Sequence, residues 1–208
     1  MCGSGRLLVP LLDDGFHMHG VDSSAARIAH CNARLEESGY AATLVRQDVA
    51  ALNLPFRYTA ALVAGAAFQF IVDPPAARSA LERLRAHLVP PGLLLLDLLV
   101  PRHAANPPGA PLVEARTVAL DDGTRIAHRC ETFVDAERRR IDTKSRFERR
   151  MGPAILARED ETLAITWYSE DEIVALLGEC GYRDIKVEPR AFEPDEDAHR
   201  FAIVARGV

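Results

Sequence analysis

The feature that most constrains the fold is a repeated alternation of short apolar runs with helix-like segments through the first half of the chain. The predicted order is helix 7–12, strand 16–21, helix 24–37, strand 41–46, strand 59–64, helix 74–87 and strand 93–99. Strands that alternate with helices form parallel sheets whose faces are covered by those helices. The sequence therefore predicts an α/β fold built on a doubly wound sheet.

The run at residues 93–99 is apolar without alternation and follows a turn predicted at Pro90-Pro91-Gly92. A strand of this composition lies in the middle of a parallel sheet, because helices bury both of its faces. We therefore expect helices on both sides of it.

The pattern changes after Pro101, where β-like segments follow one another without helices between them. These segments are residues 113–120, 124–134, 140–149 and 163–168, with hairpin turns predicted at residues 121–123 and 135–137. They predict an inserted antiparallel β-layer at residues 112–168, within a single domain of residues 1–208. The last predicted elements are a helix at 170–179 and strands at 182–189 and 201–205.

A glycine-rich turn, Gly3-Ser4-Gly5, opens the first predicted helix, and aspartates follow the next two strands at Asp22 and Asp48. Glycine lets backbone amides approach a ligand closely, and a helix N-terminus offers free N–H donors. A carboxylate at a strand tip is placed to accept hydrogen bonds from both hydroxyls of a ribose. A polar residue one strand further can accept from an adenine amino group.

In these segments the chain resembles the class I S-adenosylmethionine-dependent methyltransferases. The matching segments follow in the family's order: Cys2-Gly3-Ser4-Gly5-Arg6, Gly20-Val21-Asp22-Ser23-Ser24, Gln47-Asp48-Val49, and residues 64–70, 87–94 and 167–182. The resemblance covers nearly the whole chain and implies a Rossmann-like methyltransferase sheet, with an inserted β-layer of the kind found in small-molecule subfamilies. It implies S-adenosylmethionine as cofactor and a small-molecule acceptor, methylated on nitrogen, oxygen or carbon.

The cofactor-binding residues that the resemblance implies are Gly3, Ser4, Gly5, Asp22, Ser23, Asp48, Val49, Ala64 and Gly65. The family's first strand and its acidic residue would lie ahead of Met1, so the resemblance also implies a sheet that lacks this strand. That strand would lie between the strands ending at Asp22 and near Gly65. We therefore expect a gap or an improvised pairing between those two strands, and weakened activity of this chain.

No strong acid–base signature is present, and methyl transfer from an activated donor does not require one. Asp97, at the end of the strand at 93–99, and His103 are the candidates for a catalytic base. Phe68 and Tyr168 are candidates for lining the acceptor pocket. The alternatives are a turn-capping role for Asp97, a solvated loop position for His103 and core packing for the two aromatic rings.

Two other functions are compatible with parts of the pattern. A nicotinamide-dependent oxidoreductase would also use Asp22, but Leu8 stands where the third glycine of its G-x-G-x-x-G fingerprint belongs. A non-catalytic interaction protein on the same fold is the other alternative. His17 and His19 share one face of a predicted strand, but no third ligand is close in the sequence, so no metal is predicted.

Charge and composition bear on the partners. A net charge of −5 disfavours nucleic acid and anionic membranes as partners. Charged residues from Arg140 to Glu148 alternate with Ile141 and Phe147, which indicates a sheet with one solvent-exposed face on which opposite charges pair. The apolar positions Ile126, Val134 and Phe147 could pair two subunits into a homodimer.

The remaining features favour a cytoplasmic protein. The four cysteines form no C-x-x-C pair, no signal peptide is visible, and the longest apolar run, residues 93–100, is too short to cross a bilayer. Lysine occurs only at Lys144 and Lys186, so arginine carries nearly all positive charge, as in proteins from GC-rich bacterial genomes.

Overall fold

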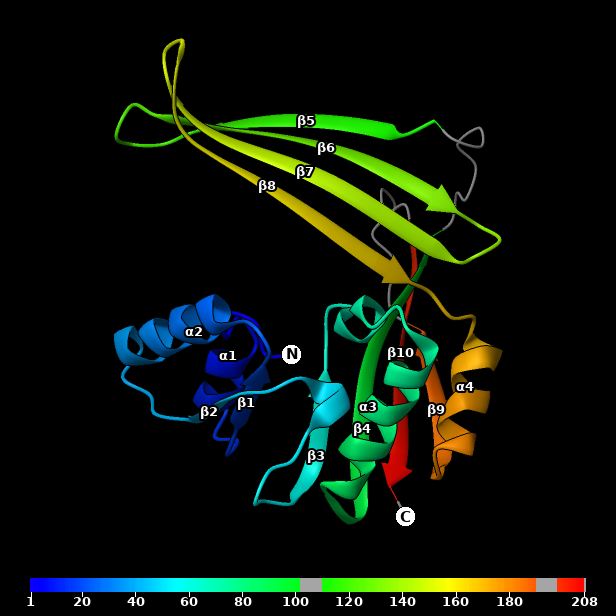
Figure 1. The fold of residues 1–208 in the computed structure, drawn as a ribbon. Coiled ribbons are helices and arrows are strands. Elements are labelled where there is room, and N and C mark those ends of the chain that lie inside the picture. Colours follow the sequence, from blue (N-terminus) through cyan, green and yellow to red (C-terminus); the bar gives the residue numbers. More distant parts are fainter. Residues whose placement is uncertain (102–109, 190–197, 208) are drawn as a thin grey trace.

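The structure is a computed structural model that describes residues 1–101, 110–189 and 198–207. A small strand pair, a four-stranded mixed sheet and a long antiparallel layer follow one another in space (Figure 1). The elements are α1 (Leu8–Asp13), β1 (His19–Asp22), α2 (Ala25–Glu37), β2 (Thr43–Arg46), η1 (Val49–Ala51), β3 (Tyr58–Val63), η2 (Ala67–Phe70), α3 (Pro74–Ala86), β4 (Leu88–Pro101), β5 (Leu112–Ala119), β6 (Arg125–Asp135), β7 (Arg140–Met151), β8 (Ala154–Thr166), α4 (Glu170–Glu179), β9 (Tyr182–Pro189) and β10 (Ala198–Gly207). No helix within the described ranges is long and apolar enough to span a membrane.

The helices begin at side chains that satisfy their first amides. Ser24 caps α2 by accepting from the Arg27 amide at 3.3 Å. Asp73 caps α3 ahead of its two prolines. Ser169 and Glu172 form a reciprocal capping box at the start of α4. Local chemistry therefore fixes these boundaries before any tertiary contact is made.

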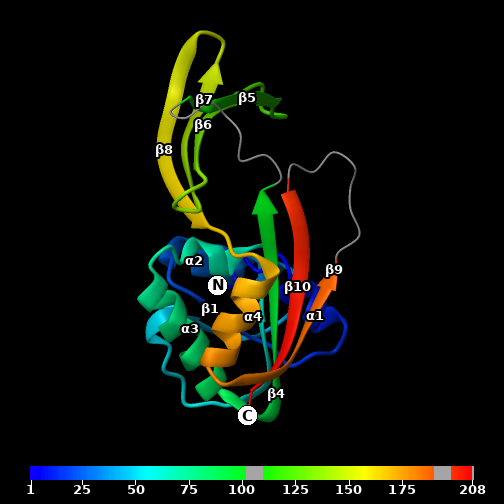
Figure 2. The same ribbon diagram turned by 90° about the vertical axis from the view of Figure 1, so that its right-hand side faces the viewer.

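The main sheet has the order β3-β4-β10-β9. β3 runs parallel to β4, whereas β10 is antiparallel to both β4 and β9. Helices α3 and α4 lie on the same side of this sheet (Figure 2). Their apolar faces meet the sheet in one core, where Leu81, Leu96 and Leu177 are at most 1% exposed.

β4 differs from the prediction in two respects. Leu94, Leu96 and Leu98 are buried under the helices, but Leu95 and Leu99 on the other face are only half-buried. The expectation of helices on both faces is therefore wrong for β4, because α1 and α2 pack against β1 and β2 instead. The segment predicted as a turn, Pro90-Pro91-Gly92, lies inside β4.

β1 and β2 form a separate parallel pair, in which His19 lies opposite Thr43 and Asp22 opposite Arg46. A small core of Leu8, Cys31 and Leu35 joins α1 to α2 beside this pair. Within the described residues β1 and β3 share no ladder, so the sheet is divided between them. The expected gap between the strand ending at Asp22 and the one ending near Gly65 is present.

The antiparallel layer has the order β5-β6-β7-β8 and projects above the main sheet (Figures 1 and 2). The sequence predicted its four strands, but β8 begins at Ala154 rather than at residue 163. Gly152, with φ +56°, turns the chain between β7 and β8. The sequence did not predict this hairpin. Residues 154–157 are apolar and residues 158–162 are charged or polar, so the segment lacks the alternation that would predict a strand, although it is exposed for almost its whole length.

Gln69 connects the layer to the main sheet. Its Nε2 donates to the carbonyl oxygens of Leu99, at 2.9 Å, and Thr166, at 2.7 Å. Its Oε1 accepts from the Leu99 amide at 2.8 Å, and the side chain is fully buried. One amide group therefore satisfies backbone groups at the ends of both β4 and β8.

Candidate cofactor site

The glycine turn leads directly into α1. Gly3 and Gly5 have φ of +57° and +79°, a conformation that favours glycine. A Cβ on Gly5 would lie 2.7 Å from Cys31 Sγ, so α2 packs against the turn too closely for any side chain there. By contrast, a Cβ on Gly3 would meet nothing within 4 Å. The backbone at Gly3 is therefore open to the approach of a ligand.

Asp22 stands at the end of β1, as predicted, and holds the glycine turn. Its Oδ2 accepts from the Gly3 amide at 2.9 Å, and its Oδ1 accepts from the Ser24 amide at 3.0 Å. The carboxylate is 5% exposed. Since each oxygen can accept a second hydrogen bond, this arrangement positions the turn and leaves acceptor capacity on Asp22.

The Asp48 side chain caps η1 by accepting from the Ala50 amide at 2.9 Å and is exposed. The neighbouring Gln47 amide donates to the Asp22 carbonyl oxygen at 3.1 Å, which places Asp48 beside the end of β1. Val49 turns inward and is 8% exposed. Thus the second and third predicted motifs meet at the same edge of the β1–β2 pair.

Gly65 and Asp97 are joined on the other side of the gap. The Gly65 amide donates to Asp97 Oδ2 at 2.9 Å, and Asp97 is 7% exposed. This bond holds the loop after β3 against β4. The guanidinium of Arg6 approaches the same loop, because a Cβ on Gly65 would lie 3.7 Å from Arg6 Nη2. The glycine turn and the loop after β3 therefore face each other, and the sequence did not predict the part played by Arg6.

The predicted pocket aromatics lie side by side at the edge of the core. Phe68 is 1% exposed, and its ring centroid is 5.8 Å from that of the half-buried Tyr168. Burial raises the pKa of Tyr168, so its hydroxyl stays protonated at neutral pH. His103, the second candidate base, lies outside the described residues.

His19 at the start of β1 and His17 just before it were considered as possible metal ligands, but they lie in different surroundings. His19 Nδ1 lies 3.0 Å from Tyr58 Oη, and the His19 ring meets Phe56 edge-on at 5.1 Å between centroids. His17 is exposed. Across the described ranges no three histidine, cysteine or acidic side chains gather as metal ligands would.

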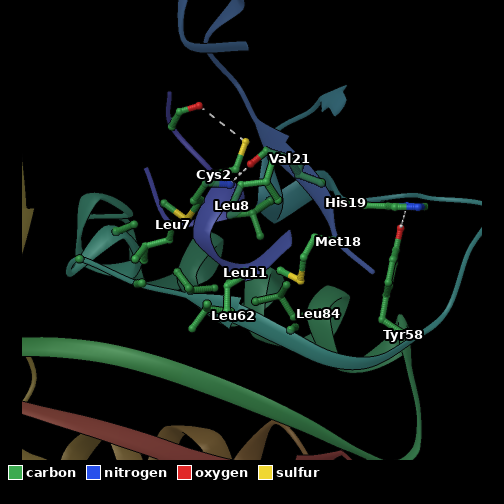
Figure 3. A pocket seen from close by; sticks show the side chains of 18 of the residues that line it. Cys2, Leu7, Leu8, Leu11, Met18, His19, Val21, Tyr58, Leu62 and Leu84 are labelled. Atoms are coloured by element: carbon green, nitrogen blue, oxygen red, sulfur yellow. Dashed lines mark hydrogen bonds between the residues drawn. The ribbon is translucent and has the colours of Figure 1, made fainter. Parts of the chain in front are cut away.

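A cavity of about 720 Å³ occupies the gap between β1 and β3 (Figure 3). Among the predicted cofactor-binding residues, Gly3, Ser4, Val49, Ala64 and Gly65 line it, whereas Gly5, Asp22, Ser23 and Asp48 do not. Its lining extends past this edge to Met18, His19 and Tyr58 at the starting ends of the strands. The sequence did not predict that Met18, His19 and Tyr58 line a cavity, because no sequence motif marks a space between two strands.

The predicted residues suit an adenosine-type ligand. An open backbone at a glycine, a carboxylate at a strand tip and a second carboxylate one strand further converge at one edge. In α/β sheets, ligands bind beyond the carboxyl ends of the strands, where the polar groups of successive loops meet.

The comparisons with known proteins agree with this geometry. Residues 1–92 match the family described as "Methyltransferase domain". An S-adenosylmethionine-dependent methyltransferase from Clostridium acetobutylicum superimposes with TM-score 0.79 at 17% identity, covering 99% of this chain and 80% of its own. No match was found among curated proteins.

Two further solved structures share the fold. CalS10, an amino pentose methyltransferase from Micromonospora echinaspora solved with S-adenosylmethionine bound, gives TM-score 0.71 at 20% identity, covering all of this chain and 80% of its own. The sugar N-methyltransferase KedS8 from a Streptoalloteichus species gives TM-score 0.77 at 16% identity, covering 98% and 76%. At such identities these structures establish the shared fold.

Proposed function

Residues 1–92 match the methyltransferase-domain family and the chain shares the fold of S-adenosylmethionine-dependent methyltransferases, and from this we propose that the protein is such an enzyme and methylates a small-molecule acceptor. The observation that carries the proposal is the fixed glycine turn. Asp22 holds Gly3 in an open conformation at the edge where the ends of β1 and β3 face each other. An adenosine-containing cofactor needs a backbone that it can approach closely and carboxylate acceptors at such an edge.

Each cofactor residue has a proposed role. The turn of Gly3, Ser4 and Gly5 lets the cofactor approach the backbone closely, with the Ser4 amide as donor, and Asp22 with Ser23 accepts from the ribose hydroxyls. Asp48 accepts from the adenine amino group, and Val49 contacts the ring with its apolar side chain. Ala64 and Gly65 close the site from the β3 side.

When bound, S-adenosylmethionine supplies a methyl group already activated by the attached sulfonium. The residues of this chain then have to orient the acceptor and exclude water. Tyr168, packed on the buried Phe68, is placed to form an apolar wall for the acceptor. Asp97 remains our candidate base, with His103 as the alternative, and its hydrogen bond to Gly65 would couple its position to the loop after β3.

For the acceptor we propose a small molecule bearing an amine, hydroxyl or nucleophilic carbon. CalS10 is an amino pentose methyltransferase and KedS8 is a sugar N-methyltransferase, so amino sugars are the first acceptors to test. We place the protein in the cytoplasm of a bacterium, with neither nucleic acid nor membrane as a partner.

We also propose a homodimer through the antiparallel layer. Cross-strand pairs on one of its faces join Val118 to Ile126 and Val134 to Ile141, and Phe147 stacks on His128 with centroids 4.3 Å apart. Val118 is 59% exposed. The other face carries charged pairs such as Arg146 with Asp160 at 2.7 Å. The more apolar face is therefore the one suited to a second subunit.

The test is a mass-spectrometric assay for S-adenosylhomocysteine with a panel of amino sugars, simple amines and phenols. We expect turnover with at least one acceptor and a strong loss in Asp22→Ala. Asp14→Ala, an exposed carboxylate at the end of α1, serves as the matched control. Cofactor binding without turnover on any acceptor would favour the non-catalytic interaction protein. Binding of a nicotinamide cofactor instead would favour the oxidoreductase.

A further inference from the structure

The Tyr168 ring is held in place at the finishing end of β4. It packs on Phe68, whose side chain is 1% exposed, with the ring centroids 5.8 Å apart. Gln69 binds the carbonyl oxygen of Thr166, two residues before Tyr168, and Ser169 just after it belongs to the capping box of α4. β8 ends beside the finishing end of β4, and the chain then passes to α4 (Figure 1). The ring is therefore fixed by its packing and by the chain on both sides of it.

The hydroxyl of Tyr168 differs from those of the other three tyrosines. Each of the others is bonded to a second side chain or to a backbone carbonyl oxygen: Tyr40 to Asp13, Tyr58 to His19 and Tyr182 to Leu81. Among the described residues none forms a hydrogen bond with the Tyr168 hydroxyl, although the side chain is half-buried. A polar group that is partly removed from water without a partner costs free energy. The Tyr168 hydroxyl is therefore suited to a partner that comes from a ligand.

Tyr168 and the candidate base Asp97 are both linked to one short loop, residues 64–70. Near the start of this loop the Gly65 amide donates to Asp97 Oδ2 at 2.9 Å. Three residues later Phe68 carries the ring of Tyr168. The loop follows β3 at the carboxyl ends of the strands, where ligands bind in sheets of this kind. Both side chains therefore belong to the edge at which the proposed reaction takes place.

The protonation state of the hydroxyl decides which group of an acceptor it can bind. Burial raises the pKa of Tyr168, so the oxygen keeps its proton and donates at neutral pH. A donor directed at the reacting atom would occupy the lone pair that has to attack the methyl group. A hydroxyl elsewhere on the acceptor is the better partner, because it can accept the Tyr168 proton without any loss of reactivity.

We propose that the Tyr168 hydroxyl binds a non-reacting hydroxyl of the acceptor and so selects hydroxylated acceptors over their deoxy analogues. The ring of Tyr168 forms the apolar wall, and its oxygen supplies a polar contact at the edge of that wall. A site that bonds a substrate hydroxyl discriminates against the analogue without it, because the polar group of the site then loses its partner. This inference rests on the proposed function and assigns a specificity-determining residue to it.

The test compares pairs of acceptors that differ by one hydroxyl: aminocyclohexanol with cyclohexylamine, ortho-aminophenol with aniline, and glucosamine with a monodeoxy analogue. Mass spectrometry of S-adenosylhomocysteine gives kcat/KM for each acceptor. We expect the wild-type protein to prefer the hydroxylated member of at least one pair by roughly tenfold or more. Tyr168→Phe keeps the ring and removes only the oxygen. It should abolish this preference by lowering kcat/KM for the hydroxylated member alone.

Binding of the acceptor is measured separately from turnover. In protein saturated with S-adenosylhomocysteine, the calorimetric affinity for the preferred acceptor should fall in Tyr168→Phe by roughly tenfold or more. The affinity for S-adenosylmethionine and the unfolding midpoint should not change, because packing on Phe68 is kept. Tyr40→Phe is the matched control. It removes a tyrosine hydroxyl that is already bonded within the protein, to Asp13, and should leave acceptor affinity and preference unchanged.

Three results would overturn the inference while cofactor binding and turnover persist, so that the proposed function stands. They are an equal loss for both members of a pair in Tyr168→Phe, an unchanged preference in that variant, and a wild-type protein that is indifferent to the hydroxyl. Absence of S-adenosylmethionine binding, or of turnover on every acceptor, would instead contradict the proposed function, and the inference would fall with it.

Discussion

The Gly3 amide donates to Oδ2 of Asp22 over 2.9 Å, from a glycine that precedes α1 to a carboxylate that ends β1. A buried carboxylate bonded in this way fixes the turn in the conformation that leaves the Gly3 backbone open. The same residue therefore shapes the site and supplies acceptors to it. Loss of Asp22 should consequently remove more than the hydrogen bonds it makes with a ligand.

Asp22→Ala should be the most damaging single change for S-adenosylmethionine binding. Each charge-assisted hydrogen bond lost costs about 1.5–3 kcal/mol, or roughly tenfold to a hundredfold in affinity. Calorimetric titration measures the effect, with Asp14→Ala as control. Wild-type affinity in Asp22→Ala would show that the cofactor binds elsewhere.

Asp48→Ala should weaken the same binding less than Asp22→Ala does. Asp48 is exposed, and its carboxylate caps the short helix η1, so solvent compensates for much of its loss. We expect an affinity loss of a few-fold, about 1 kcal/mol. A larger loss than that of Asp22→Ala would reverse the ranking of the two carboxylates.

Gln69→Ala should destabilise the fold strongly. It removes three buried hydrogen bonds and leaves backbone groups of Leu99 and Thr166 unsatisfied, at about 1–3 kcal/mol for each group. Chemical denaturation should show a loss of several kcal/mol, consistent with the usual total of about 5–15 kcal/mol for a domain.

Gln47→Ala is the control for that measurement. Gln47 also bonds a backbone amide and a carbonyl, both of Asn53, but at the surface where water can replace it. Its loss should cost about 1 kcal/mol or less. Equal losses in the two variants would mean that Gln69 does not join the layer to the sheet.

Cys2 should react with iodoacetamide in a strongly pH-dependent way. Burial raises the pKa of its thiol from an ordinary value of 9.0 to about 11, and only the thiolate is nucleophilic. The alkylation rate should therefore keep rising up to pH about 11, whereas the rate for glutathione levels off near pH 9. Mass spectrometry measures the rate, and Cys2→Ser assigns the signal. A plateau near pH 9 would contradict the burial of Cys2.

Elements whose ends are marked by local chemistry could be predicted from the sequence. Ser24 and Gly39 bound a helix predicted through residue 37, and the structure ends α2 at Glu37. Likewise, the final strand predicted at residues 182–189 is β9. Caps and turns act on neighbouring residues, so a single sequence contains the whole signal.

The features that went unpredicted depend on contacts between distant segments. Leu7 lies on the same predicted apolar face as Leu8, yet it is 42% exposed while Leu8 is 5% exposed, because only Leu8 packs in the core with Cys31 and Leu35. The bond between Gly3 and Asp22 joins residues 19 positions apart, and that of Gln69 to Thr166 spans 97 positions. Sequence spacing can indicate that such residues belong to a site, but it cannot show which of them form hydrogen bonds with each other.

The most direct test of the central claim is a calorimetric titration of S-adenosylmethionine into the protein, repeated with NAD as competitor. The account predicts one cofactor site per chain, weakened by Asp22→Ala and indifferent to NAD. Failure to bind S-adenosylmethionine, or displacement of it by NAD, would contradict the assignment of this protein as an S-adenosylmethionine-dependent methyltransferase.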